Sequence, residues 1–175
     1  RGEAMFRQPR GAMLAVRSSA EQVRARLPPD VEIAACNAPQ LTIVSGPLAS
    51  IDVLAAAFEA TDVGVTHLKV SHAFHSASMV GALPAVEAAL GRAQLRAPVS
   101  MLYSCISGEP LEAREATDPA YWARQVRAPV QFSRAVAAEI VRGDALFVEV
   151  GPGQALTALV RQQRDGAGQV PRIVP

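Results

Sequence analysis

The residues best suited to acid–base chemistry in this sequence are its three histidines, His67, His72 and His75. Histidine moves protons readily near neutral pH, because the unperturbed pKa of its imidazole lies near 6.5. The last two enclose the short run His72-Ala-Phe-His75. A histidine at the end of a strand is more often a packed residue without chemistry, so the flanking segments must decide between the two interpretations.

The histidines stand where a strand pattern gives way to a helix pattern. The run from 65 to 70 alternates like a strand, and helical spacing of apolar residues begins near Ser78. Loops at the ends of strands often carry catalytic groups, because the scaffold fixes their position and leaves them accessible. The sequence therefore predicts a functional loop at residues 71–76.

Composition excludes several classes of protein. The 175 residues are half apolar, and 17 Lys and Arg nearly match 16 Asp and Glu, so no basic face for nucleic acid is expected. No apolar run reaches the roughly 18 residues of a membrane span, and we expect a soluble, cytoplasmic protein. Cys36 and Cys105 are expected to be buried free thiols. No cluster of His, Cys or carboxylates has metal-ligand spacing, so we expect neither a metal nor a redox cofactor.

The first part of the chain predicts a small α+β unit. Turn residues and apolar spacing place strands at 11–17, 31–36, 41–45 and 63–70, with helices at 20–27 and 51–60. The order strand, helix, strand, strand, helix, strand is that of a ferredoxin-like layer, in which two helices back four antiparallel strands.

The second part predicts longer alternating elements. Helices are expected at 79–93, 118–126, 131–142 and 155–164, and strands at 99–104 and 145–150. Pro84 either kinks the first of these helices or sits in its first turns. The strand at 145–150 is continuously apolar, as in parallel sheets. Residues 165–175 are expected to form a linker, and residues 1–10 to lead in from a preceding segment.

Six motifs follow one another along the chain: Gly11-Ala-Met-Leu-Ala-Val16, Ala35-Cys-Asn-Ala-Pro39 with Val44-Ser-Gly-Pro47, His72-Ala-Phe-His75-Ser76, Asp118-Pro-Ala-Tyr-Trp122, Arg127-Ala-Pro-Val-Gln-Phe132 and Phe147-Val-Glu-Val-Gly-Pro-Gly153. In order and spacing they resemble the acyltransferase domains of modular type I polyketide synthases. The resemblance covers residues 11–163.

This resemblance implies a fold and a reaction. Family members carry a large α/β-hydrolase-like domain into which a ferredoxin-like subdomain is inserted, with the active site between them. Residues 11–71 would be the small subdomain, and residues 72–164 the C-terminal part of the large one. The implied reaction moves a malonyl unit from malonyl-CoA to the phosphopantetheine thiol of an acyl carrier protein through an acyl-serine, with no bound cofactor.

One family feature is missing. The family nucleophile is a serine in a Gly-His-Ser-x-Gly turn, which lies upstream of the small subdomain together with an arginine that pairs with the malonyl carboxylate. This sequence contains no Gly-x-Ser-x-Gly. We therefore expect it to be the C-terminal portion of an acyltransferase domain and to be inactive alone. Its expected partners are the missing half of the domain, an adjacent ketosynthase, other synthase domains and the carrier protein.

The resemblance assigns the catalytic pair. His75 matches the general base, which takes the serine proton and later returns one to the leaving thiol. A backbone carbonyl orients this histidine in the family, and we place that carbonyl at Gln125. The alternative is that Gln125 is a helix-end residue with a solvated side chain.

The resemblance also assigns substrate-facing residues. His72 and Phe74 fill the positions that select the extender unit, and a bulky Phe74 favours malonyl, because it would collide with an α-methyl group. Phe74 could also be a core packing residue, which is compatible with this role. Asn37 lies on a predicted turn that faces the cleft in the family, where it would hydrogen-bond the substrate or a neighbouring loop. The alternative for Asn37 is a turn-forming role before Ala-Pro.

Two other functions remain open at this point. The chain could belong to a free-standing malonyl-CoA transacylase of fatty-acid synthesis. It could also be a catalytically silent ferredoxin-like docking module in which His75 is structural.

Overall fold

A four-stranded antiparallel sheet forms the N-terminal half of the molecule. In the computed structural model, which describes residues 1–143, 145–163, 168 and 170–174, the strands are β1 (Ala12–Val16), β2 (Glu32–Ala38), β3 (Leu41–Gly46) and β4 (Val65–His67). Their order in the sheet is β2-β3-β1-β4. Leu14 lies opposite Val44 on one side and His67 on the other. This is the order of a ferredoxin-like sheet, as the sequence predicted.

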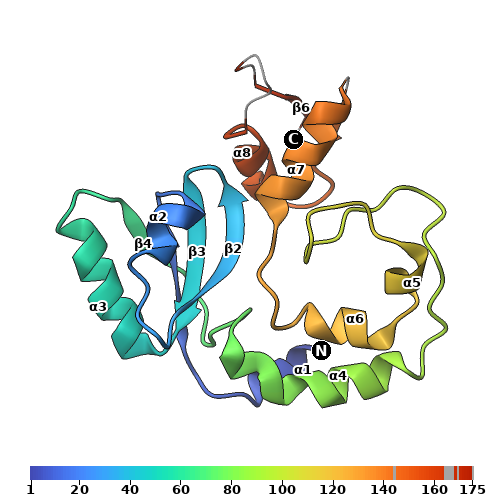
Figure 1. The fold of residues 1–175 in the computed structure, drawn as a ribbon, viewed down its shortest axis with the longest axis horizontal. Coiled ribbons are helices and arrows are strands. Elements are labelled where there is room, and N and C mark those ends of the chain that lie inside the picture. The colour runs from blue at the N-terminus through green and yellow to red at the C-terminus, as the bar shows by residue number, and fades with distance from the viewer. Residues whose placement is uncertain (144, 164–167, 169, 175) are drawn as a thin grey trace.

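Two helices cover one face of this sheet, α2 (Ala20–Arg24) and α3 (Leu48–Glu59) (Figure 1). Ser19 begins α2, because its side chain accepts a hydrogen bond from the Gln22 amide. Apolar side chains of both helices and of the strands meet in one core, which contains Leu14, Val16, Val23, Val44, Ile51 and Phe58. All six are almost completely buried, so this half of the molecule closes its own hydrophobic core.

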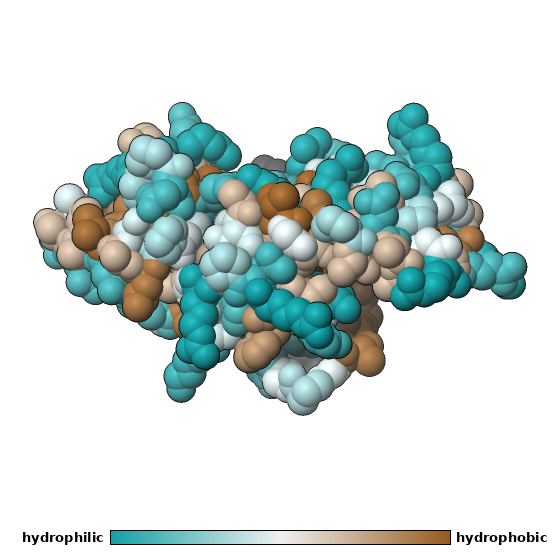
Figure 2. Space-filling model, turned by 90° about the horizontal axis from the view of Figure 1, so that it is seen from below, coloured by the Kyte–Doolittle hydropathy of each residue, from teal (hydrophilic) through white to brown (hydrophobic). Residues whose placement is uncertain are grey.

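A group of helices forms the lower layer in Figure 1. It contains α1 (Gly2–Phe6), the 3₁₀ helix η1 (Ala77–Ala82), α4 (Leu83–Leu90), α5 (Ala113–Ala116) and α6 (Pro119–Arg124). A second core joins η1, α4 and α6 through Met79, Ala82, Val86, Ala123 and Val126. Figure 2 shows the layer from below, where hydrophobic and hydrophilic residues are mixed over its surface.

Proline determines where two of these helices begin. The single helix predicted for 79–93 is divided into η1 and α4, and Pro84 lies in the first turn of α4, which is one of the two positions we expected. The side chain of Asp118 caps α6 by accepting a 2.9 Å hydrogen bond from the Ala120 amide, and Pro119 is the first helical residue. The helix predicted for 118–126 is therefore confirmed, and it ends at Arg124.

The C-terminal elements are α7 (Phe132–Arg142), β5 (Leu146–Val148), α8 (Ala155–Val160) and β6 (Arg172–Val174). β5 pairs in parallel with β6, with Phe147 opposite Ile173, so the predicted parallel pairing is correct although the strand is short. The expected linker at 165–175 contains β6 where it is described. Residues 165–167, 169 and 175 of that expectation lie outside the described part of the chain.

The prediction of a buried strand at 99–104 is wrong. Val99 is fully exposed and Met101 is half exposed. Leu102 and Tyr103 instead contact Leu111 and Pro110, through a 2.7 Å bond from the Leu111 amide to the Leu102 carbonyl and an isolated bridge. An apolar run becomes a strand only when a neighbour satisfies its backbone groups, and none of the described strands lies beside this one.

Two smaller expectations also meet the structure. Both cysteines are free thiols, but only Cys36 is partly buried, whereas Cys105 is exposed because it lies in the turn after Ser104. Within the described ranges, no helix combines the length and the apolar character that crossing a bilayer requires.

Candidate active site

His75 occupies the loop between β4 and η1 with an unusual backbone conformation. Its φ is +58°, in the left-handed region that residues other than glycine seldom adopt. Ser76 fixes the loop directly after it: its hydroxyl donates a 2.6 Å hydrogen bond to the Ala73 carbonyl and accepts one from the Ser78 amide. A strained backbone at a loop that the surrounding structure holds in place is typical of functional sites.

A single strong hydrogen bond orients the imidazole of His75. Nδ1 lies 2.8 Å from the carbonyl oxygen of Ala128. Because a carbonyl can only accept, Nδ1 must carry the proton, and Nε2 is then the unprotonated nitrogen of the neutral ring. This tautomer is the one that can take a proton through Nε2.

The surroundings of His75 favour its neutral form. Burial lowers the pKa of the imidazole below its ordinary value of 6.5; the Ala128 carbonyl raises it, the positive charge of Arg1 lowers it, and the Gln125 main chain raises it least. With a lowered pKa the ring is neutral at pH 7, so it is available as a proton acceptor.

The orienting carbonyl was predicted one helical turn too early. We expected the Gln125 carbonyl to hold the imidazole. The 2.8 Å hydrogen bond instead goes to Ala128, and hydrogen bonding by the Gln125 main chain also raises the pKa of His75 but is the smallest of the contributions. The cause is local: Gln125 still has helical dihedrals, and the amides of Arg127 and Ala128 bond back to Arg124, so the helical turn continues to Ala128. The last carbonyls of a helix have no amide partner inside the helix, so the Ala128 carbonyl is available to accept the hydrogen bond from His75.

The other two histidines are unsuited to the role of base. His72 is buried, its Nε2 donates to the Phe6 carbonyl at 3.0 Å, and its Nδ1 accepts from the Ser71 hydroxyl at 2.7 Å. Both ring nitrogens are therefore in use. His67 lies on the exposed edge strand β4, with its Nε2 3.9 Å from Asp52. The structure thus distinguishes His75 from its neighbours by geometry.

The predicted selector residues lie together beside His75. The rings of His72 and Phe74 are 5.8 Å apart, and the ring of Phe6 lies 5.3 Å from that of His72 on a different element. Phe74 is half-buried and contacts both the helix core at Met79 and a cluster on the sheet around Met13. It therefore packs where the two halves of the molecule meet, one residue from the imidazole.

Asn37 does not join this group. It lies inside β2, not on the turn that we predicted, because the strand extends to Ala38. Its main-chain carbonyl accepts a hydrogen bond from Gln163 Nε2 at 3.3 Å. Among the described residues, no hydrogen bond or ring contact joins Asn37 to His72, Phe74 or His75. The structure therefore gives Asn37 a role in joining β2 to the segment after α8.

Arg1 is a candidate residue that the sequence analysis missed. Its Nη1 donates a 3.1 Å hydrogen bond to the side-chain oxygen of Gln125, and its charge acts on His75. No spacing rule singles out this arginine, because it stands more than seventy positions before the histidine in the chain. Only the fold brings the guanidinium and the imidazole together.

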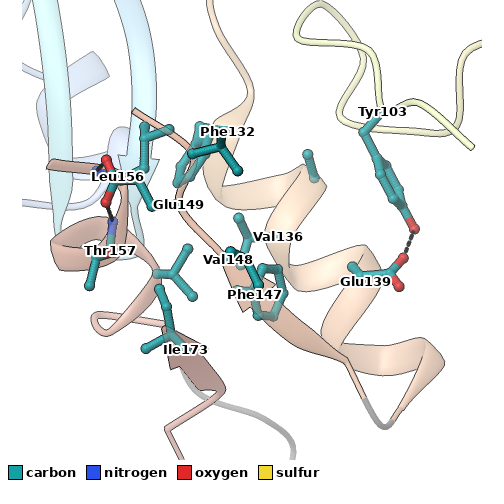
Figure 3. A pocket seen from close by; sticks show the side chains of 13 residues that line it. Tyr103, Phe132, Val136, Glu139, Phe147, Val148, Glu149, Leu156, Thr157 and Ile173 are labelled. Carbon is teal, nitrogen blue, oxygen red and sulfur yellow. Dashed lines mark hydrogen bonds between the residues drawn. The ribbon is translucent and has the colours of Figure 1, made fainter. Parts of the chain in front are cut away.

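An apolar cavity lies in another part of the molecule. It has a volume of about 280 Å³ and lies between α7, α8 and β5, lined by Phe132, Val136, Phe147, Leu156 and Ile173 among others. Figure 3 shows Tyr103 reaching Glu139 across one end, at 2.7 Å, and Glu149 bonded to the start of α8. His75 does not line this cavity, so its chemistry must be sought at the loop. Within the described ranges, no three His, Cys, Asp or Glu side chains converge as a metal site.

Comparison with known proteins identifies the family. The family model of the acyl transferase domain matches residues 1–175. This chain belongs to the acyl transferase domain family. A phenolphthiocerol/phthiocerol polyketide synthase of Mycobacterium tuberculosis is 34% identical over 157 residues, which are 90% of this chain and 11% of that protein. The resemblance to polyketide synthase acyltransferases is confirmed.

Solved acyltransferases share the fold. The acyltransferase domain from the second module of the salinomycin polyketide synthase matches with a TM-score of 0.89 at 32% identity, over 99% of this chain and 41% of that chain. Malonyl CoA-acyl carrier protein transacylase from Clostridium perfringens matches with a TM-score of 0.86 at 25% identity. The match covers 99% of this chain and 57% of the transacylase chain. This chain thus spans about two fifths of the length of the salinomycin domain.

Proposed function

We propose that this acyltransferase chain supplies the general base and the extender-unit loop of a polyketide synthase domain that transfers a malonyl unit from malonyl-CoA to an acyl carrier protein. The observation that carries the proposal is the hydrogen bond from His75 Nδ1–H to the Ala128 carbonyl at 2.8 Å. It leaves Nε2 of a neutral ring to accept a proton, as serine acylation requires.

The proposed reaction has two balanced halves. A serine from the remainder of the domain attacks the thioester carbonyl while Nε2 of His75 takes the hydroxyl proton; the carbon–sulfur bond breaks, and the proton passes to the coenzyme A sulfur. In the second half Nε2 takes the proton of the carrier thiol, which attacks the acyl-serine ester. The serine oxygen leaves and recovers the proton.

Electrostatics around His75 support an acyl group with a free carboxylate. The imidazolium that forms during each half is stabilised by the Ala128 carbonyl and opposed by Arg1. A malonyl carboxylate bound to the Arg1 guanidinium would offset that opposing charge and would gain charge-assisted hydrogen bonds. We expected the carboxylate-binding arginine outside this sequence; Arg1 is a candidate within it.

Selection of malonyl is proposed to depend on Phe74. This half-buried ring stands one residue from His75 and packs on both halves of the molecule, so it has little freedom to move away from an α-substituent. One misfitting methyl group is worth roughly 1–3 kcal/mol of discrimination. The length of the polyketide synthase relative supports neighbouring synthase domains and a carrier domain as partners.

The rate of malonyl transfer to carrier protein by the complete polypeptide tests the proposal. His75→Ala should lower the rate by roughly 10²-fold or more, the contribution of a positioned proton-transfer group. His67→Ala is the matched control, because that histidine lies half exposed on the edge strand β4 with Asp52 as its neighbour, and it should keep the wild-type rate. Full activity of His75→Ala would instead support a silent docking module.

A second variant tests the carboxylate partner. Arg1→Ala should lower kcat/KM for malonyl-CoA by about 10- to 100-fold, because hydrogen bonds to a charged group are worth about 1.5–3 kcal/mol. It should lower kcat/KM for acetyl-CoA, which lacks the carboxylate, much less. Equal losses of kcat/KM with malonyl-CoA and acetyl-CoA would show that Arg1 does not bind the malonyl carboxylate.

A different observation tests the alternative function. A native polypeptide that also carries a ketosynthase is a synthase, whereas one without it is a free-standing transacylase.

A further inference from the structure

The first residue of β2 touches both segments that hold the catalytic hydrogen bond. Glu32 Oε1 accepts a hydrogen bond from the Ala77 amide at 2.9 Å, and Glu32 Oε2 lies 2.6 Å from Nη2 of Arg127. Ala77 is two residues after His75, and Arg127 directly precedes Ala128. One carboxylate therefore joins the chain on the donor side of the Nδ1–H···O=C bond to the chain on its acceptor side.

The environment makes this link stronger than a surface ion pair. The side chains of Arg127 and Glu32 are 34% and 30% exposed, whereas those of Arg134 and Glu109, an ion pair of the same length, are 61% and 49% exposed. Partial burial reduces screening by solvent. Glu32 also uses its two oxygens for two different partners, so both interactions depend on one side-chain conformation.

The backbone of β2 provides independent support for this geometry. Residues 34–36 pair with the segment after Ala128: the Val130 amide donates to the Ala34 carbonyl at 2.9 Å, and the Cys36 amide donates to the Val130 carbonyl at 2.8 Å. β2 is thus the rigid reference against which the acceptor segment is placed. Through Glu32 the same strand reaches the loop after His75, whose positive φ must be held by its surroundings.

We propose that Glu32 is a positioning residue for His75, which sets the distance between the imidazole and the Ala128 carbonyl by clamping the two segments to the small subdomain. The proposal rests on the proposed function, because it assumes that His75 is the base. The groups that face the imidazole are the Ala128 and Gln125 carbonyls and the Arg1 guanidinium, so Glu32 acts on it through geometry. Misplacement of a catalytic group by about 1 Å can cost on the order of 10²-fold in rate.

Three variants in the complete acyltransferase domain separate the two interactions. Glu32→Ala removes both, Glu32→Gln keeps an acceptor for the Ala77 amide but loses the charge, and Arg127→Met keeps the bond to Ala77. We expect Glu32→Ala to lower kcat for malonyl transfer by about 10- to 100-fold with a KM change below about threefold, as for other residues that orient a catalytic group. The two milder variants should lose less. Glu109→Gln breaks the exposed pair with Arg134 and is the matched control.

Adding Arg127→Met to Glu32→Ala should cause no further loss, because groups that act as one unit are not additive. Equal kcat values for wild type and Glu32→Ala, with both folded by circular dichroism, would overturn the clamp. If Glu32→Ala fails to fold, Glu32→Gln and Arg127→Met test the clamp in its place. A wild-type kcat in both of these variants would also overturn the clamp.

A spectroscopic measurement separates this proposal from the proposed function. In the domain labelled with ¹⁵N-histidine, the hydrogen-bonded Nδ1–H of His75 should be visible in wild type and Glu109→Gln and should be weakened or lost in Glu32→Ala. An unchanged signal in Glu32→Ala contradicts the clamp even if His75 is catalytic. A lost signal supports the clamp even if the wild-type protein transfers no malonyl.

Discussion

Apolar runs occur both in the small subdomain (residues 11–71) and in the C-terminal region (residues 72 onwards). Those of the small subdomain form a buried sheet, whereas two of those in the C-terminal region remain exposed. In the small subdomain, Leu14 and Val44 pair across β1 and β3 and are fully buried. In the C-terminal region, Val99 and Val150 are at least nine-tenths exposed, although each belongs to an apolar run that predicted a strand. An apolar pattern therefore indicates only that a segment tends to form a strand. Whether it joins a sheet depends on whether a neighbouring strand is available to pair with it.

The difference follows from where the partners lie. All four strands of the ferredoxin-like unit lie within residues 12–67. Among the residues that the structure describes, β5 pairs only with the three-residue strand β6. Because the solved salinomycin domain is more than twice as long as the matched region, we expect the remainder of a complete domain to cover the exposed apolar residues. His75 lies where the closed unit and the open region meet.

Hydrogen exchange should give the largest contrast. Amides of β1 and β3 should open only with global unfolding, whereas amides of β5 and β6 should open locally, because their strands have few buried contacts. Since native domains are stable by about 5–15 kcal/mol, the rates should differ on the order of 10³-fold or more. The measurement is amide exchange by mass spectrometry or NMR. Similar protection in the two regions would mean that the C-terminal region is as well packed as the sheet.

Core substitutions should show the same contrast in stability. Phe58 is almost fully buried against the sheet, so Phe58→Ala should lower the free energy of unfolding by about 3–5 kcal/mol. In the 175-residue chain by itself Val150 is 93% exposed, so Val150→Ala in that chain should change the free energy of unfolding by less than about 0.5 kcal/mol. Denaturant titration of each variant measures both values. A large loss from Val150→Ala would show that this side chain is covered in solution.

The smallest effect should be a pH dependence of α8. Glu149 accepts hydrogen bonds from the Thr157 and Leu156 amides. The Thr157 side chain, then the Thr157 amide and then the Leu156 amide lower the pKa of its carboxyl below the ordinary 4.5. A depressed carboxyl pKa stabilises the fold above pH 4.5, and this stabilisation is lost as the pH falls through the folded-state value. The Leu156 and Thr157 amide resonances should therefore shift below pH 4.5 in wild type.

Glu149→Gln is the control for that titration, because its amide cannot ionise in this range. The two resonances should then be nearly independent of pH. A titration that persists in Glu149→Gln would assign the effect to another carboxyl group.

Sequence patterns predicted the small subdomain well for a physical reason. Each of its strands and helices buries one face in a core formed by neighbours along the chain. The spacing of the apolar residues in the sequence therefore matches the set of residues that is buried. The position of Pro84 in the first turn of α4 was also predictable, because it depends only on the local chemistry of proline, which has no backbone N–H to donate. The conformation of residues 99–104 could not be predicted in this way, because whether this apolar run forms a strand depends on a pairing partner that is distant in the sequence.

The candidate site was predictable in part. The motif around His75 indicated the residue that we propose as the base. The identity of the orienting carbonyl depended on where α6 ends, and helix ends are uncertain by one to two residues or more. Glu32 and Arg1 carried no pattern at all, because three-dimensional proximity alone connects them to His75. Asn37 was assigned to a turn that is in fact the end of a strand.

The most direct test of the central claim is the mass of the complete polypeptide before and after brief exposure to malonyl-CoA. The account predicts a gain of one malonyl group that is released to a carrier protein and that is formed far more slowly by His75→Ala. A complete domain that gains no malonyl group, or a His75→Ala variant that gains it at the wild-type rate, would contradict the account.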